Sequence, residues 1–218
     1  MAKKCTSQQI IDSYSHYVIT HGKQPKSVFA FMELDNKWEE SDFYAHFSSF
    51  EHVNEEIFFR FFDQTTKLIH KDEGYQTFDA KNKLLTFYYT FFEILTANRS
   101  FVVYAMDGHS DKIKALSMLK KLRKSFKSYI NALDIETIEL PIEILQKMKG
   151  KGLEEAAWMQ LLLAIKFWMD DRSSGFEKTD VYIEKSIQAT FDLLQTPPLQ
   201  SVVDLGKFIF QEKIQPNI

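Results

Sequence analysis

Apolar residues recur at helical spacing along most of the chain. Residues 7–21 place their apolar positions on one face, and residues 49–69 repeat the pattern over a longer stretch. These two stripes consist of Ile10, Ile11, Tyr14, Tyr17 and Val18, and of Val53, Ile57, Phe58, Phe61, Phe62, Thr65 and Leu68. Further helices are predicted at 27–34, 39–47, 79–96, 101–106, 111–132, 141–149, 153–171, 176–195 and 199–213. Seven Gly and five Pro in 218 residues leave little room for the turns of a sheet-rich fold, so the pattern predicts an all-α protein.

Polar and glycine residues mark where these helices begin and end. Ser27 follows Pro25 and is a good N-cap, and Ser49 is placed to cap the helix of residues 49–69. Residues 35–37 form a turn between two short helices, and Gly150 with Gly152 is expected to end the helix at 141–149. The spacing predicts a three-helix headpiece at 1–48 and a larger helical body at 49–218.

The two short helices around a turn resemble the amino-terminal domain of the TetR family of bacterial regulators. The matching elements are the sequence FYAHF at 43–47 and the Ser-Phe-Glu that opens the next helix at Ser49. This resemblance implies a TetR-like fold: a helix-turn-helix headpiece on a helical body that binds a ligand and forms a homodimer. It also implies that residues 39–47 enter the major groove of DNA. The candidate DNA-binding residues are then Lys26, Lys37, Ser41, Asp42, Tyr44 and His46.

The charge of this stretch is unusual for a DNA reader. Residues 27–47 contain one basic residue, Lys37, against five acidic residues, a net charge of minus four. DNA is a dense row of phosphates, so a reading helix normally lies in a positive field. The sequence therefore predicts weak or absent binding to DNA at physiological salt.

Two long helices late in the chain are the expected dimer interface, one from Leu153 to Asp171 and one from Phe176 to Gln195. The TetR resemblance implies that they meet their symmetry mates in a four-helix bundle. The turn between them, Asp171-Arg172-Ser173, followed by Phe176 and Lys185, is also similar to a segment of the ubiquinone-biosynthesis accessory proteins that share the TetR fold and bind lipid. A pair of ordinary helix caps also explains this turn and is the favoured interpretation, because such caps are common.

Aromatic residues are abundant, with 20 Phe and nine Tyr, and many lie in the predicted body. They could line an apolar cavity for a small molecule or lipid, or they could form a filled core. The candidate ligand-binding residues are Tyr88, Phe91, Phe92, Tyr104, Trp158, Leu162 and Phe167. A basic helix at 111–132 could approach an anionic surface, or it could be balanced by acids on neighbouring helices.

Other classes of function find no support in the sequence. The six His residues are scattered, Cys5 is the only cysteine, and we find no nucleophile motif or phosphate loop, so no catalytic residue, metal site or cofactor is expected. We expect no export signal and no transmembrane segment, and a cytoplasmic location. Three hypotheses remain. They are a ligand-responsive TetR-like transcriptional regulator, a TetR-fold lipid or apolar-ligand binder that does not bind DNA, and an assembly protein with a filled core.

Overall fold

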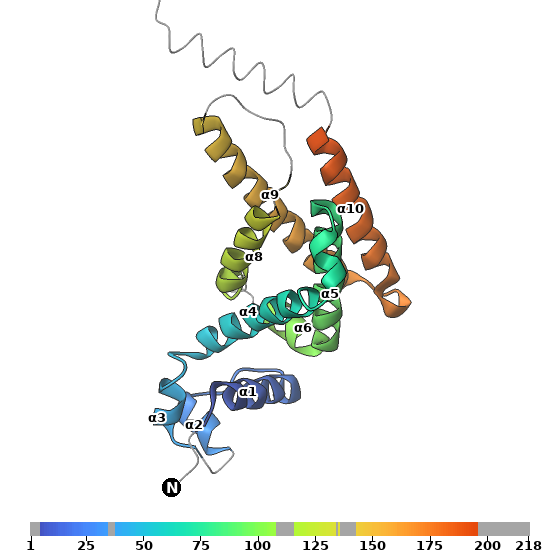
Figure 1. Ribbon diagram of the computed structural model, residues 1–218. Helices are drawn as coiled ribbons and strands as arrows, with labels where there is room; N and C mark the ends of the chain where they lie inside the picture. Colours follow the sequence, from blue (N-terminus) through green and yellow to red (C-terminus); the bar gives the residue numbers. More distant parts are fainter. Residues whose placement is uncertain (1–4, 35–37, 108–115, 134, 136–142, 196–218) are drawn as a thin grey trace, which may run out of the picture. The chain divides into compact units, whose positions relative to one another are not determined.

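The structure is a computed structural model that describes residues 5–34, 38–107, 116–133, 135 and 143–195, without the side chains of 143–151 and 195. Throughout these residues the regular secondary structure is helical and contains no strand (Figure 1), which confirms the all-α prediction. The chain divides into two compact units. Unit 1 contains Met1–Asp72 and Thr90–Phe126, and unit 2 contains Glu73–Tyr89 and Lys127–Ile218.

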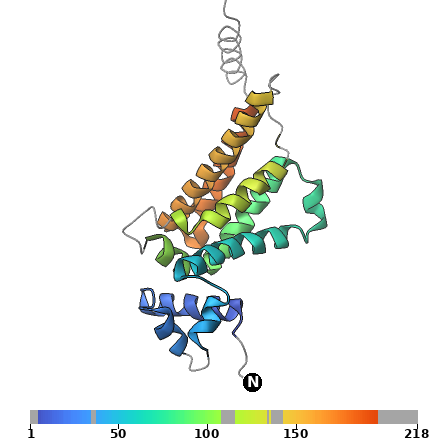
Figure 2. The ribbon, with the colours of Figure 1, turned by 90° about the vertical axis from the view of Figure 1, so that its left-hand side faces the viewer.

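Unit 1 begins with a cluster of three helices (Figure 2): α1 at Ser7–His21, α2 at Val28–Glu33 and α3 at Glu40–Tyr44. The longer α4 at Phe50–Ile69 follows, and α6 at Arg99–Asp107 belongs to the same unit. The predicted caps are present, because the Ser27 hydroxyl accepts a hydrogen bond from Ala30 N and the Ser49 hydroxyl accepts one from His52 N. The turn at 35–37 lies outside the described residues.

An aromatic core holds the first helices of unit 1 together. Phe31 of α2, Phe43 of α3 and Phe50 of α4 are all buried. Their ring centroids lie 5.4–6.4 Å apart at steep angles, and the Tyr14 ring of α1 stacks on Phe50 at 5.2 Å. Edge-to-face contacts of this kind add to the stability gained from burial. The first four helices of unit 1 therefore share a well-packed interior.

Unit 2 is built on two long helices, α9 at Glu143–Asp170 and α10 at Glu177–Gln195, which are connected through the short helix η2 at Ser174–Phe176. The α9 and α10 helices run antiparallel and contact each other (Figure 1). The short helix η1 at Glu73–Thr77 also lies in unit 2. Two helices contain residues of both units: α5 at Ala80–Ala97 and α8 at Lys120–Ala132.

A pair of buried phenols fixes η1 inside unit 2. The Tyr75 and Tyr129 hydroxyl oxygens lie 2.8 Å apart, and the Tyr129 hydroxyl donates to the Lys83 carbonyl oxygen at 3.1 Å. Because Tyr129 has one proton to give, Tyr75 is the donor in the contact between the two phenols. The Tyr129 ring also packs on Phe87, with centroids 4.7 Å apart. This chain of hydrogen bonds attaches η1 to α8 and α5.

Three details of the helix prediction are wrong. The helix predicted at 111–132 is not continuous, because a turn at 118–119 precedes α8. Gly150 and Gly152 do not end a helix, because α9 runs continuously from Glu143 to Asp170. A glycine inside a helix costs about 1 kcal/mol relative to alanine, which the packing of the following turns can offset. Leu68, expected in the apolar stripe of α4, is exposed, and Ile69 is buried instead. The predicted helix at 199–213 and the first part of the one at 111–132 lie outside the described residues.

Candidate functional site

The predicted reading helix is short and begins among acids. Glu39 precedes α3, and Glu40 and Asp42 lie in its first turn. The carboxylate of Asp42 accepts a hydrogen bond from Glu39 N at 3.1 Å, and the Ser41 hydroxyl donates to the Glu39 carboxylate at 3.3 Å. Carboxylates stabilise the positive amino end of a helix. The same charges repel phosphate, so this end of α3 is poorly suited to a DNA backbone.

His46, a second candidate DNA contact, has a partner inside unit 1. Its Nε2 atom donates a hydrogen bond to the Cys5 carbonyl oxygen at 2.9 Å. This bond joins the chain that follows α3 to the segment that precedes α1, and the Cys5 side chain is itself buried. His46 thus has a structural contact that sequence reasoning missed, because the two residues are 41 positions apart.

The candidate DNA-binding residues differ in their exposure and in their hydrogen bonds. Tyr44 and Lys26 are exposed, and Lys37 lies outside the described residues. Of the six candidates, Ser41, Asp42 and His46 form hydrogen bonds within unit 1. Ser41 and His46 are exposed as well, so their hydrogen bonds do not remove them from the surface.

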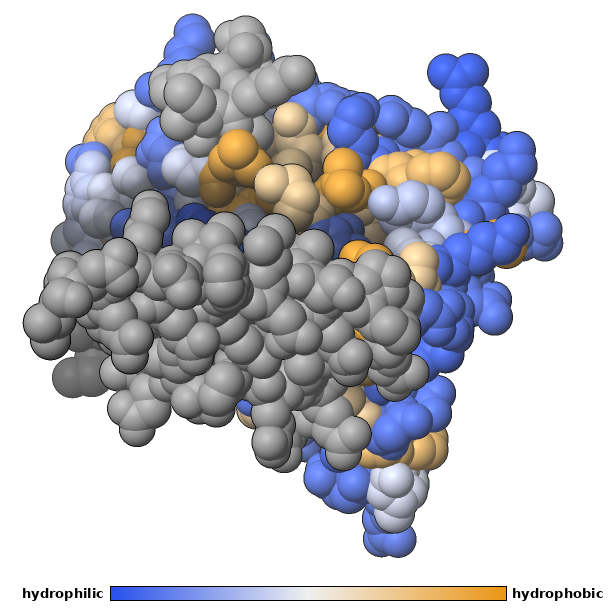
Figure 3. Space-filling model, turned by 90° about the horizontal axis from the view of Figure 1, so that it is seen from above, coloured by the Kyte–Doolittle hydropathy of each residue, from blue (hydrophilic) through white to orange (hydrophobic). Residues whose placement is uncertain are grey.

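Exposed apolar residues interrupt the polar surface of the molecule (Figure 3). On α9, Met159 and Leu163 are 55% and 52% exposed, and Phe167 follows one further turn along the same face. On α10, Val181 and Leu193 are exposed as well. Residues four apart share one face of a helix, so α9 presents an apolar stripe. Exposed stripes of this kind are typical of interaction surfaces.

The turn between α9 and α10 is held by one carboxylate. Buried Asp171 accepts hydrogen bonds from the backbone N–H and hydroxyl groups of both Ser173 and Thr179, at 2.7–2.9 Å. Burial opposes its ionisation, but these four hydrogen bonds outweigh burial and lower the pKa of Asp171 to about 2. Gly175 and Phe176 then adopt positive φ angles of 62° and 61°. The helix-cap interpretation of Asp171 therefore accounts for this turn.

The candidate ligand residues divide between the two units. Phe91, Phe92 and Tyr104 belong to unit 1, whereas Tyr88, Trp158, Leu162 and Phe167 belong to unit 2. Tyr88 and Trp158 are buried, and burial, with a smaller contribution from Tyr182, raises the pKa of Tyr88. Its hydroxyl is therefore protonated at physiological pH and can donate a hydrogen bond. Phe167 is partly exposed and stacks on Tyr182, with centroids 4.5 Å apart.

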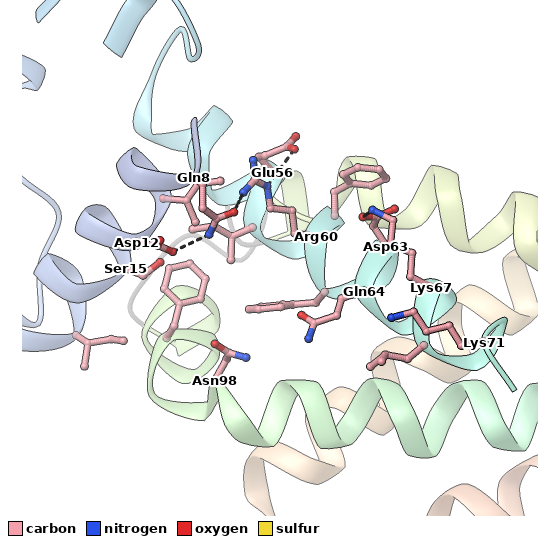
Figure 4. A pocket seen from close by; sticks show the side chains of 17 residues that line it. Gln8, Asp12, Ser15, Glu56, Arg60, Asp63, Gln64, Lys67, Lys71 and Asn98 are labelled. Carbon is pink, nitrogen blue, oxygen red and sulfur yellow. Dashed lines mark hydrogen bonds and ion pairs between the residues drawn. The ribbon is translucent and has the colours of Figure 1, made fainter. Parts of the chain in front are cut away.

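A pocket of about 900 Å³ lies in unit 1, where the sequence analysis predicted none (Figure 4). Its lining comes from α1, α4 and the start of α6, and includes none of the candidate ligand residues. The sequence did contain a signal for this pocket. Four polar residues in and just beyond α4 recur at intervals of three or four positions, the spacing of one helix face: Arg60, Gln64, Lys67 and Lys71.

The described part of the chain contains neither a metal cluster nor a membrane-spanning helix. No group of three or more His, Cys, Asp or Glu residues lies there in an arrangement that could hold a metal ion. None of the helices described is both long and apolar enough to span a bilayer.

Comparison with known proteins identifies the family. A family model described as "Tetracyclin repressor-like, C-terminal domain" matches residues 83–209, more than half of the chain. A search of curated proteins found no match. The matched residues include most of α5 and all of α6, α8, α9 and α10, and the helices α1–α3 precede them. The all-helical fold agrees with this match. The chain therefore belongs to the tetracyclin repressor-like (TetR) family.

Proposed function

We propose that the protein is a ligand-responsive transcriptional regulator that acts as a homodimer and has a weak DNA-reading helix. The observation that carries this proposal is the tetracyclin repressor-like match at 83–209, downstream of three short helices. In this proposal residues 1–48 are the helix-turn-helix headpiece, and residues 49–218 bind ligand and dimerise. A regulator of this kind works beside DNA, so we place it in the cytoplasm.

The exposed stripe on α9 supports the dimer. Met159, Leu163 and Phe167 lie at intervals of four residues, and about half of the first two side chains is open to water in the single chain. A symmetry-related copy would cover this stripe with its own α9 and α10, because the same patch faces itself across a two-fold axis. The interface proposed is therefore 153–171 with 176–195.

The body would hold an apolar small molecule or lipid. In unit 2, buried Tyr88 and Trp158 each carry one polar group on a large ring, a combination that can orient an apolar ligand. Leu162 and Phe167 of the same unit complete this proposed set, and Phe91, Phe92 and Tyr104 stay separate candidates within unit 1.

The acids of α3 favour a second candidate function, an apolar-ligand or lipid-binding protein of TetR fold that does not bind DNA. Each uncompensated acid at a reading helix meets phosphate repulsion, and only an acid that accepts from cytosine N4 gains a base contact in return. Glu39, Glu40 and Asp42 lie together at the start of α3, and Asp42 already accepts a hydrogen bond from the backbone N–H of Glu39.

Selection of random DNA duplexes by the purified protein separates the two functions. Weak selection of a palindrome by the natural protein at low salt, lost at moderate salt, supports the proposed regulator, whereas no selection at either salt supports the second function. In either case the double variant Glu39→Lys, Glu40→Lys should gain salt-dependent binding. A control variant with the same change in charge, Glu93→Lys with Glu177→Lys, alters exposed acids outside the headpiece and should gain none. If the natural protein selects a palindrome with nanomolar affinity, the charge argument is wrong and the plain regulator function stands.

A further inference from the structure

We propose that the pocket of unit 1 is a binding site for a single-chain amphipathic carboxylate, such as a fatty acid, with its head near Lys67 and Lys71 and its tail along the apolar floor. This goes beyond the proposed function, because the pocket shares no lining residue with the candidate ligand set of the body. Figure 4 shows the residues that carry the argument.

The pocket is an elongated site between helices. Its lining residues on α4 begin at Glu56 and continue to Lys71, just beyond the end of that helix, and those on α1 run from Gln8 to Ile19. At about 1.5 Å per residue, the α4 wall is about 22 Å long. The volume of about 900 Å³ lies within the range of small-molecule sites, roughly 300–1,000 Å³. A long, narrow ligand fits this shape better than a compact one.

The floor of the pocket is apolar and only partly covered. Ile57, Phe61 and Phe101 are buried residues that also line the pocket. Ile19 of α1 and Leu68 of α4 line it too, yet they are 48% and 43% exposed. Apolar surface left open inside a concave site gains free energy when an apolar chain covers it. The tail of the ligand would cover Ile19 and Leu68.

One end of the pocket is closed by its own hydrogen bonds. Arg60 of α4 donates to the side chains of Gln8 and Ser7 on α1, and it also pairs with Glu56 at 3.5 Å. Gln8 in turn donates to the Asp12 carboxylate at 2.7 Å. These polar groups satisfy one another, so this end offers little to a charged head group.

The other end carries the donors that a carboxylate needs. Lys67 pairs with Asp63 at 2.6 Å, whereas the Lys71 ammonium forms no ion pair with any described residue. The Gln64 side chain lies beside them in Figure 4 and can donate through its amide. The local charge is therefore positive where Lys71 enters the pocket. An anionic head fits this end, and a cationic one does not.

Displacement of a fluorescent fatty acid, cis-parinarate, from the full-length protein tests the ligand class. We expect dodecanoate to displace the probe at concentrations about two- to fivefold lower than dodecanol, and dodecylammonium to be weakest, because one exposed ion pair contributes a factor of this order. Equal displacement by all three would overturn the proposed role of the lysines.

Two variants locate the site. Lys71→Glu should weaken dodecanoate about tenfold and leave dodecanol almost unchanged, and Leu68→Glu should weaken both. The matched controls Lys178→Glu and Leu34→Glu change exposed residues of the same type outside the pocket and should bind as the natural protein does. All these positions are exposed, so the variants should keep their helix content and melting temperature, which circular dichroism checks. If neither pocket variant weakens dodecanoate, the proposal fails.

A photoreactive fatty acid with a diazirine in its chain then shows where the tail lies. Peptide mapping should find the label in α1 and α4. Label confined to α5 or α9 would overturn this site and would support the ligand cavity of the proposed function, so the two failures are distinguishable.

Discussion

The phenol pair of unit 2 allows a directional prediction about stability. Tyr129 donates to the Lys83 carbonyl and accepts from Tyr75, so the two hydroxyls have different roles. Tyr129→Phe removes two hydrogen bonds, the one that Tyr129 accepts from Tyr75 and the one that it donates to the Lys83 carbonyl, at about 0.5–1.5 kcal/mol each. Tyr75→Phe removes one donor and leaves the bond from Tyr129 to Lys83 intact, which costs about 0.5–1.5 kcal/mol. The first variant should therefore be the less stable of the two.

The double variant Tyr75→Phe, Tyr129→Phe sharpens this test. It loses the same two hydrogen bonds as Tyr129→Phe alone, so its stability should be close to that of the single variant, and the two changes should not add. The Phe87 contact is kept in all three variants, since the rings are unchanged. A change of about 1 kcal/mol in the free energy of unfolding corresponds to roughly 2–4 °C in the melting temperature of a protein of this size.

Urea denaturation at one fixed protein concentration measures these differences, because a dimer makes the apparent stability depend on concentration. Tyr44→Phe is the control: that side chain is 55% exposed, and its loss should change the free energy of unfolding by less than about 0.5 kcal/mol. A cost of Tyr75→Phe equal to or above that of Tyr129→Phe, or strict additivity in the double variant, would refute the chain of hydrogen bonds from Tyr75 through Tyr129 to Lys83.

Three further predictions follow from caps and exposed surfaces. The pKa of Asp171 is lowered in the folded state, so the contribution of this carboxylate to stability is complete above the ordinary carboxyl range near pH 4 and is lost as the pH falls towards 2. Asp171→Asn should therefore lower the melting temperature at pH 7 and remove this part of the dependence of stability on acid pH. Leu163→Glu should convert the proposed dimer into a monomer in light scattering at micromolar concentration, whereas Leu34→Glu should leave the dimer intact; a monomeric natural protein would contradict the interface. Ser27→Ala removes the cap of α2 and should cost about 1 kcal/mol in urea denaturation, which Ser27→Asp should largely restore.

Local signals in the sequence were enough to predict most of the helices. The helix at Ser7–His21 has the predicted bounds because Thr6 caps one end and Gly22, at a positive φ of 63°, ends the other. The prediction failed where tertiary packing outweighs local preference, as at Gly150 and Gly152 inside α9. A glycine signals only that a helix can end there, and the apolar face of the following turns decides whether it does.

The candidate site was predictable in its charges but not in its contacts. The acids around α3 are evident in the sequence, because charge needs no coordinates. The hydrogen bond from His46 to the Cys5 carbonyl joins residues far apart in sequence, and no local sequence pattern indicates it. The pocket of unit 1 is similar: Leu68 fits the apolar stripe of α4 by spacing, and only the structure shows that it is exposed beside Lys71 in the pocket.

The headpiece keeps its packing and its surface charge on separate sets of residues. Phe31, Phe43 and Phe50 form the interior, whereas Glu39 and Glu40 lie at the start of α3 and are not part of it. Mutation can therefore change what this surface attracts without unfolding the helices beneath it. An ancestor able to bind DNA could lose that ability through a few single-residue replacements, each changing stability by about 1 kcal/mol or less, and could regain it in the same way. Over evolutionary time, the shape of such a headpiece outlasts its function.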